Sequence, residues 1–419
     1  MNDPRLAEPA RRTKLEARMR FVNTLAKRLH EYGTSAPRLE SAIDNVAARL
    51  GLHCQSLSTP TSIILSYTDL DDDDTLADHT QVLRLEPGEL DLKRLSEVDA
   101  IAEQVSAGQL GIVEGYRALR ELEGKPRPLL LRVTPAAYGL ASGSVATLFK
   151  GSWLDVATAA AIGALIGLMA LSKQARPGLA AAFEALAALV AGFLVVLVHE
   201  HAPTLAMNQV VVSSLIVLLP GLTLTTAVNE IASNHLVSGV ARLAQASAVL
   251  LKLAFGALVA MQLGKALGFD LAVASGVPVP QWAEWLALLA GSFAFAILFR
   301  AARVDYPLVM ASAWLGFIAT RIGGTLGGVE FGVFIAAFVV SAAANAYGRI
   351  RNRPGALVRV PGIILLVPGS VGFRSVFAAF ERDILSGLEI AITMIVLLVS
   401  LVGGLLFGNL VVPPRKTLS

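Results

Sequence analysis

The stretch IVLLPGL at residues 216–222 interrupts an apolar segment with a Pro-Gly pair, and ILLVPGS at residues 364–370 does the same 148 positions later. Proline lacks a backbone N–H and glycine relaxes φ, so each pair predicts a break in a helix. The same offset aligns Ser238-Gly239 with Ser386-Gly387 and brings seven identities into 24 positions. The sequence therefore predicts an internal repeat with one broken helix in each copy.

The chain contains ten apolar segments, and two of them include the Pro-Gly breaks. Each segment is long enough, alone or with its break, to cross a hydrocarbon core about 30 Å thick. They lie at residues 130–149, 154–172, 178–198, 207–236, 240–267, 280–299, 304–321, 328–347, 358–384 and 388–412. Five segments per repeat is an odd number, so the two halves enter the membrane from opposite faces, as in many secondary transporters. We predict a polytopic α-helical membrane protein with about ten transmembrane helices in two five-helix inverted repeats.

Charge divides the chain into two regions. Residues 1–129 carry 38 of the 67 charged side chains, whereas the much longer region 130–419 carries 29. A single soluble globule is therefore excluded. Helical spacing and three short β-like runs in the first region predict a small α+β domain at 1–129. Two membrane modules are expected to follow, at 130–275 and 276–419.

Basic residues are distributed unevenly around the apolar segments. If the N-terminal domain is cytoplasmic, loops and ends assigned to the cytoplasm carry eleven Lys or Arg residues, and those assigned outside carry five. This asymmetry follows the positive-inside rule and predicts a multi-pass protein with a cytoplasmic N-terminal domain and C-terminus. Because the excess cation lies beside apolar segments, we do not expect nucleic acid as a partner.

The two Pro-Gly breaks are candidate substrate-binding sites. Each break starts a half-helix near the bilayer centre, and free N–H groups at a helix N-terminus favour an anion such as a carboxylate. The alternative is an ordinary proline kink, with hydroxyl groups bonded to their own backbone. The candidate substrate-binding residues are Pro220, Gly221, Thr223, Thr225, Thr226, Asn229, Pro368, Gly369 and Ser370.

Five ionisable residues in or near the apolar segments are candidates for proton coupling or charge pairing. Glu230 either holds an ammonium group or a proton, or forms a solvated cap at the cytoplasmic interface. Lys252 lies amid AVLLKLAFGAL, where a charge is costly, and is expected to find a buried partner in Glu184 or Glu230. His235 is expected at the interface, with a proton-carrying role as the alternative. Asp155 either interacts with a helix dipole or belongs to an outer gate.

No motif argues for a metal, a cofactor or nucleotide hydrolysis. The chain contains no Gly-x-Ser-x-Gly, P-loop or dinucleotide-binding fingerprint. His199 and His201 lack the i, i+4 spacing of a helical zinc pair, and the single cysteine, Cys54, cannot form an internal disulfide or a cysteine-based metal cluster. We therefore predict a transporter without a metal or cofactor.

Six stretches of the sequence resemble the threonine/serine exporter family of secondary transporters. The family resemblance rests on FVNTLAKRLHEYGTSAPRLESAIDNVAARLGL (21–52), TPTSIILSY (59–67), LSEVDAIAEQVSAGQLG (95–111), FKGSWLD (149–155), LLPGLTLTTAVNEIASNHLVSGVARLAQA (218–246) and VPGIILLVPGSVGFRS (360–375). The resemblance covers nearly the whole chain, and the stretch at 218–246 is the most specific. Two family modules would meet near residue 275, which matches the repeat.

The resemblance implies export of small amino acids such as threonine and serine across the bacterial inner membrane, driven by a proton or ion gradient. It also implies a functional signature of Pro220, Gly221, Thr223, Asn229, Glu230, Gly239 and Arg242. The expected partners are an amino acid and the lipid bilayer, and a homo-oligomer is left open. A dicarboxylate such as succinate is the alternative substrate. A membrane-anchored hydrolase, with its chemistry in the N-terminal domain, is the alternative class of protein.

Overall fold

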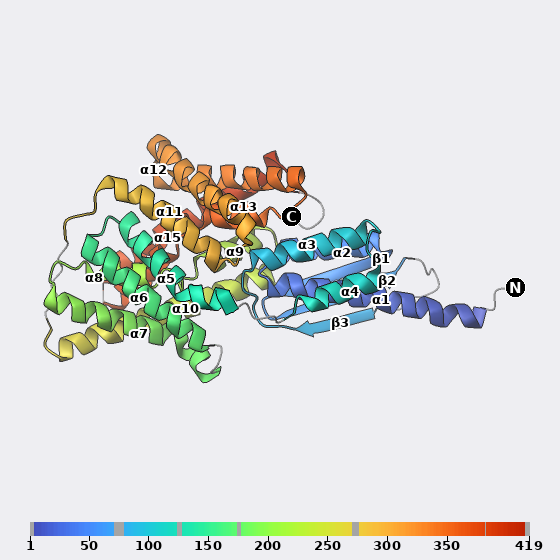
Figure 1. Ribbon diagram of the computed structural model, residues 1–419, viewed down its shortest axis with the longest axis horizontal. Helices are drawn as coiled ribbons and strands as arrows, with labels where there is room; N and C mark the ends of the chain where they lie inside the picture. Colours follow the sequence, from blue (N-terminus) through green and yellow to red (C-terminus); the bar gives the residue numbers. More distant parts are fainter. Residues whose placement is uncertain are drawn as a thin grey trace.

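A computed structural model of the chain describes residues 4–70, 79–123, 128–173, 177–269, 276–381 and 383–414. The fold is mainly helical, with one small sheet near the N-terminus. The N-terminal domain lies at one end of the long axis of the molecule and the long apolar helices lie at the other (Figure 1). This division follows the division of charge along the sequence.

Helices and strands of the N-terminal domain form the predicted α+β arrangement. The helices are α1 (Pro4–Glu31), α2 (Ala36–Arg49), α3 (Leu92–Ser106) and α4 (Ile112–Glu121), and the strands are β1 (Leu52–Thr59), β2 (Ser62–Asp69) and β3 (His79–Arg84). The strands are antiparallel and lie in the order β1-β2-β3.

Alternation along β2 explains the core of this domain. Ile63, Leu65 and Tyr67 lie on one face of the strand and are fully buried, as the period of two along a strand requires. Helix α1 contacts β2 and contributes Phe21 and Leu25, which are also fully buried. This core continues into the membrane part, where Phe295, Phe299 and Leu357 belong to the same hydrophobic cluster.

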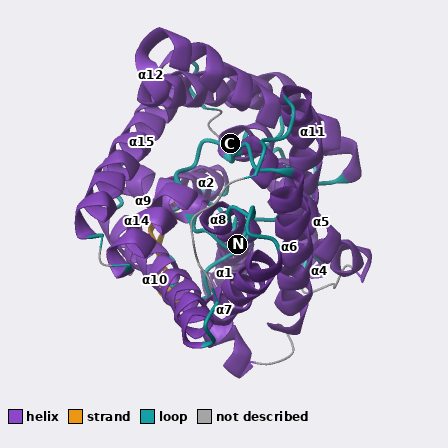
Figure 2. Ribbon diagram, turned by 90° about the vertical axis from the view of Figure 1, so that its left-hand side faces the viewer, coloured by secondary structure: helices purple, strands orange, loops and turns teal. Residues whose placement is uncertain are grey.

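The membrane part of the protein runs from α5 to α15. Its helices are α5 (Pro128–Leu148), α6 (Trp153–Lys173), α7 (Pro177–His201), α8 (Met207–Ser214), α9 (Gly221–Ala232), α10 (Leu236–Ala266), α11 (Gln281–Leu298), α12 (Tyr306–Arg351), α13 (Ala356–Ile363), α14 (Gly369–Phe380) and α15 (Ile384–Val411). A short 3-10 turn, η1 (Arg303–Asp305), precedes α12. Figure 2 looks along the long axis and shows the long helices at the periphery of this part.

Six of the described helical stretches are long and apolar enough to cross a membrane. They are Trp153–Ser172, Ala180–His201, Leu236–Ala266, Gln281–Leu298, Arg303–Arg351 and Ile384–Val411. The chain is therefore a polytopic helical membrane protein, as predicted. The number of ten crossings rests on the shorter and bent helices and stays a prediction.

Helix α12 covers two of the predicted apolar segments. Its 46 residues would extend about 69 Å at 1.5 Å per residue, roughly twice the thickness of a bilayer core. Gly327 and Gly328 have non-helical backbone angles, and the φ of +87° at Gly328 is one that glycine adopts without strain. A Cβ added to Gly323 would lie 2.9 Å from Cα of Gly332, so α12 folds back on itself at the Gly-Gly pair.

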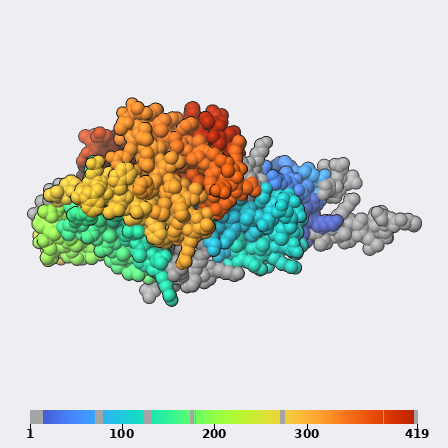
Figure 3. All heavy atoms as spheres, turned by 45° about the horizontal axis from the view of Figure 1, so that its top comes forward, coloured from blue at the N-terminus to red at the C-terminus, as the bar shows by residue number. Residues whose placement is uncertain are grey.

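Matching elements occur in the two halves of the membrane part. Helices α8 and α13 have 8 residues each, and α9 and α14 have 12 residues each. The backbone angles before α9 and α14 are also alike, with φ −79° and ψ 41° at Pro220 and φ −82° and ψ 35° at Pro368. Helix α10 contacts α14, and α15 contacts α9, so the halves pack reciprocally. Figure 3 shows the first half (green) beside the second half (yellow to red).

Candidate functional site

The two Pro-Gly breaks lie against each other, although 148 residues separate them in the sequence. Helix α9 begins at Gly221 and helix α14 at Gly369, each directly after its proline. A Cβ added to Gly369 would lie 3.0 Å from both N and Cα of Gly221, and one added to Gly221 would lie 3.3 Å from Cα of Gly369. Glycine at both positions therefore allows the two backbones to approach closely.

The first backbone bond closed within each half-helix is made to the carbonyl of its proline, while the Gly221 N–H donates to Leu219 O at 2.8 Å. The Leu224 N–H donates to Pro220 O at 2.9 Å, and the Gly372 N–H donates to Pro368 O at 3.0 Å. Earlier N–H groups of the first turn have no acceptor within an α-helix, and they form the positive end of its dipole. The two adjacent helix starts therefore favour a negatively charged group beside them.

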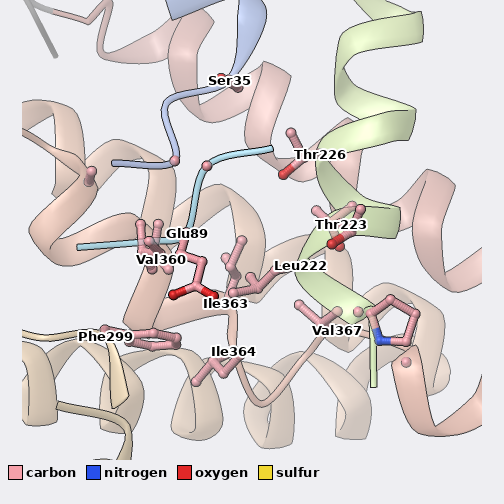
Figure 4. A pocket seen from close by; sticks show the side chains of 18 of the residues that line it. Ser35, Glu89, Leu222, Thr223, Thr226, Phe299, Val360, Ile363, Ile364 and Val367 are labelled. Carbon is pink, nitrogen blue, oxygen red and sulfur yellow. The ribbon is translucent and has the colours of Figure 1, made fainter. Parts of the chain in front are cut away.

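A cavity with a volume of about 1170 Å³ lies beside the breaks. Residues of α9 form part of its wall, and Thr223 and Thr226 are seen there on the α9 ribbon (Figure 4). Ser35 and Glu89, from two loops of the N-terminal domain, line another part of it. The cavity thus lies between the two domains and has ample room for a small organic molecule.

Eight of the nine predicted substrate-binding residues line this cavity. They are Pro220, Gly221, Thr223, Thr225, Thr226, Asn229, Gly369 and Ser370, whereas Pro368 is not among the lining residues. The side chain of Thr225 is buried, and its Oγ1 has no hydrogen-bond partner among the described residues. Substrate binding by these residues stays a prediction, but the structure brings them together at one cavity.

Glu230 lies outside the cavity wall, in a buried ion pair under the N-terminal domain. Its carboxylate is fully buried and accepts hydrogen bonds from Arg242 Nε at 3.0 Å and Ser238 Oγ at 2.8 Å. It also accepts one from the backbone N–H of Ala36 at 2.9 Å. Ala36 opens α2, whose N-cap residue Ser35 makes no side-chain cap, so Glu230 supplies the missing acceptor. The expectation of a solvated cap is wrong because Glu230 is not exposed, and its position relative to the membrane surface stays a prediction.

His235 also lies at the contact between the two domains. Its Nε2 is 3.2 Å from Glu40 Oε2, and its Nδ1 lies 2.8 Å from Ser233 O. Its expected position at the membrane interface stays a prediction. Backbone bonds strengthen the same contact, since the Leu92 N–H donates to Phe299 O at 3.0 Å.

Lys252 pairs with one of its two predicted partners. Its Nζ is 3.5 Å from Glu184 Oε2 and donates to Ala181 O at 3.1 Å. The partner Glu184 is partly buried, with 17% of its side chain exposed, whereas 43% of the Lys252 side chain is exposed on the protein surface. Glu184 lines the cavity and Lys252 does not, so the pair connects the cavity wall to the outer face of α10.

Asp155 is buried at the start of α6, where a carboxylate interacts favourably with the helix dipole. Its carboxylate accepts hydrogen bonds from Ser152 N at 2.7 Å and Ser152 Oγ at 2.8 Å, and from Ala206 N at 2.8 Å. Ala206 directly precedes α8. Asp155 thus ties the start of α6 to the start of α8, as the helix-dipole alternative predicts, and an outer-gate role stays untested.

Three arginines that line the cavity, Arg38, Arg300 and Arg359, were missed as site residues. Arg359 was counted at the cytoplasmic edge of its segment, although a charge within the apolar run ALVRVPGI is a signal for function. Arg38 lies in α2, and nothing in the local sequence indicates that α2 meets the cavity. Burial at this contact lowers the pKa of Arg38 to about 10.

A polytopic helical protein with a large cavity at two broken helices belongs to the class of membrane transport proteins. Within that class, the chain belongs to the threonine/serine exporter family. Models of this family match residues 20–264 and 284–411.

Curated relatives include proteins named pheromone-regulated membrane protein 10. The one from Zygosaccharomyces rouxii is 26% identical over 385 residues, which cover 89% of this chain and 38% of that protein. The one from Eremothecium gossypii is 24% identical over 425 residues, covering 95% of this chain and 56% of that protein. The chain therefore spans only 38% to 56% of the length of these relatives. No solved structure matches the chain.

Proposed function

We propose that this protein is a secondary active transporter that exports small amino acids, threonine or serine, across a bacterial inner membrane. In this proposal, inverted five-helix modules at 130–275 and 276–419 cross the membrane ten times. The domain at 1–129 and the C-terminus face the cytoplasm. The observation that carries the proposal is the meeting of two half-helix starts at a cavity of about 1170 Å³. Membership of the exporter family supports the substrate class.

Substrate chemistry follows from the groups that line the cavity. The carboxylate of the amino acid would bind beside the N-terminal ends of the half-helices, where the helix dipoles are positive. Hydroxyl groups of Thr223 and Thr226 and the amide of Asn229 are available for the ammonium and side-chain hydroxyl groups. Among the five predicted ionisable candidates, Glu184 is the carboxylate that lines the cavity, so we propose it as the residue that couples transport to the proton gradient.

A dicarboxylate such as succinate is the second candidate substrate. Its support is the pair of cavity arginines, Arg38 and Arg359, because neither has a carboxylate within 4 Å in the described part of the chain. Two such guanidinium groups would suit two carboxylates.

The hydrolase alternative has weaker support. In the N-terminal domain, Ser56 Oγ donates to Asp44 Oδ1 at 3.2 Å, but no described histidine nitrogen bonds to either side chain to complete a nucleophile–base arrangement. Burial raises the pKa of the Cys54 thiol to about 12, which keeps it protonated at neutral pH.

Counterflow in proteoliposomes tests the proposal directly. Vesicles containing the full chain and unlabelled threonine are expected to accumulate labelled threonine and serine, at a rate that changes when a pH gradient is imposed. Succinate serves as the comparison substrate. Exchange of succinate without exchange of either amino acid would assign the protein to dicarboxylates, and no exchange by correctly folded protein would reject the transport proposal.

Thr225→Val is expected to separate substrate binding from stability. Valine has nearly the same shape as threonine, and removing a buried hydroxyl that has no partner relieves a cost of about 1–3 kcal/mol. The unfolding temperature should therefore stay equal or rise, while threonine exchange falls several-fold if the hydroxyl bonds the substrate. Thr320→Val is the matched control, because Thr320 Oγ1 already donates to Gly316 O at 2.8 Å. A fall in stability with unchanged exchange for Thr225→Val would contradict the expectation.

A further inference from the structure

Arg359 is a buried cation in the wall of the cavity, and no carboxylate of the described residues pairs with it. Arg359 lies on α13, and only 7% of the residue is exposed. Its Nη2 donates to Asn345 Oδ1 at 2.5 Å and to Asn409 Oδ1 at 3.3 Å, while its Nε is buried and has no partner in the described part of the chain. Amide oxygens satisfy a donor but leave the positive charge uncompensated, which is unfavourable inside a protein.

Most of the other charged groups of the cavity are paired; Arg38, which is only partly buried, is the second cation without a carboxylate within 4 Å among the described residues. Arg242 bonds Glu230, Arg300 lies 2.7 Å from Glu89, and Glu184 lies 3.5 Å from Lys252. Arg359 differs from these residues because no carboxylate of the described residues lies within 4 Å of its guanidinium group. A ligand that brings a negative charge into the cavity would therefore meet an uncompensated cation at Arg359.

A hydrogen-bond network holds the guanidinium group in place. Asn345 Nδ2 donates to Asn409 Oδ1 at 2.8 Å and to Val412 O at 2.6 Å. Ser341 Oγ lies 3.1 Å from Asn409 Oδ1. These bonds come from α12 and α15, and they direct the two amide oxygens toward Arg359 on α13. The orientation of the cation is thus fixed before any ligand binds, which lowers the entropic cost of binding.

We propose that Arg359 binds the carboxylate group of the transported substrate from within the cavity. This inference rests on the proposed transport function and adds a specific charged anchor to it. A guanidinium group with an open edge suits a carboxylate because it donates two directed hydrogen bonds along with its charge. The substrate carboxylate would supply both the missing acceptor for Nε and the missing counter-charge.

Calorimetric titration of the purified full chain tests this proposal, with ligands that differ only at the carboxylate. The probes are L-threonine against L-threoninamide, and succinate against succinamide. We expect the wild-type protein to bind one of the two acids at least about tenfold more tightly than its amide. In Arg359→Gln this preference is expected to fall below about threefold, because the anchor no longer carries a charge.

Two further variants separate binding from folding. Arg359→Lys retains the charge without the planar fork, so we expect it to keep an intermediate preference for the acid. Arg374→Gln, at an exposed position on α14 outside the cavity lining, is the matched control and should keep the wild-type preference. Unfolding temperature and gel-filtration profile verify that each variant is folded.

The outcomes distinguish this inference from the proposed function. If threonine is preferred over threoninamide in the wild type and equally in Arg359→Gln, the anchor is wrong while amino-acid binding stands. If the preference concerns only succinate and disappears in Arg359→Gln, the anchor stands while the amino-acid proposal fails. A wild-type protein that prefers neither acid over its amide overturns the anchor.

Discussion

Gly369→Ala is expected to lower threonine exchange by at least about tenfold, and Gly369→Val is expected to abolish it. The new Cβ would lie 3.0 Å from N and Cα of Gly221, which are backbone atoms and cannot rotate away as a side chain can. Overpacking of this kind costs about 1–3 kcal/mol, and about 1.4 kcal/mol corresponds to a tenfold change in an equilibrium constant. The cost would be borne at the contact between the two half-helices, beside the proposed binding site.

The matched control is Gly403→Ala on α15 of the same half. A Cβ at Gly403 would meet its nearest neighbour, the Phe334 ring, at 3.8 Å, which is an ordinary contact. Exchange by Gly403→Ala is therefore expected to resemble wild type. Counterflow rates, normalised to folded protein measured by gel filtration, provide the comparison. Exchange by Gly369→Ala within twofold of Gly403→Ala would show that close approach of the two breaks is unimportant.

Most helices could be predicted from the sequence because their causes are local. Apolar length and a Pro-Gly pair determine where helices run and break without reference to the rest of the chain. The bend at Gly327-Gly328 accordingly falls between two predicted segments, and α9 and α14 begin at the glycines of their Pro-Gly pairs. The sheet was likewise indicated by its own alternation of buried and exposed residues.

The arrangement of the candidate site depends on contacts between residues that are distant in the sequence. The repeat indicated that both helices break, but nothing in one sequence indicates that Gly221 and Gly369 touch. One of the hydrogen-bond partners of Glu230, the backbone N–H of Ala36, lies 194 positions away in the sequence and in the other domain. Arg359 was visible as a charge in an apolar run, but its lack of a carboxylate partner depends on how α12, α13 and α15 pack. The partners of the charged side chains and the contacts between the two domains could therefore be seen only in the structure.

Glu230→Gln is expected to destabilise the protein by about 3 kcal/mol and to loosen α2 from the membrane part. The substitution leaves the Arg242 guanidinium, whose side chain is only 16% exposed, without its carboxylate partner. Removing one member of a buried ion pair costs about 3–5 kcal/mol because the remaining charge is uncompensated. The weaker acceptor also holds the Ala36 N–H less firmly at the start of α2. Thermal unfolding and hydrogen exchange of α2 measure the two effects.

A double variant decides between docking and proton coupling as the role of Glu230. If Glu230 serves docking, the double variant Glu230→Gln/Arg242→Gln should recover more than half of the stability lost in Glu230→Gln, because no charge then remains buried. Threonine exchange by the single variant Glu230→Gln should still depend on the pH gradient. Glu389→Gln is the matched control, since Glu389 is exposed and forms no ion pair with the described residues. If Glu230→Gln exchanges threonine with no response to the pH gradient and the double variant fails to restore stability, Glu230 carries the proton and the docking role is wrong. The buried ion pair with Arg242 and the bond to Ala36 make docking the expected result.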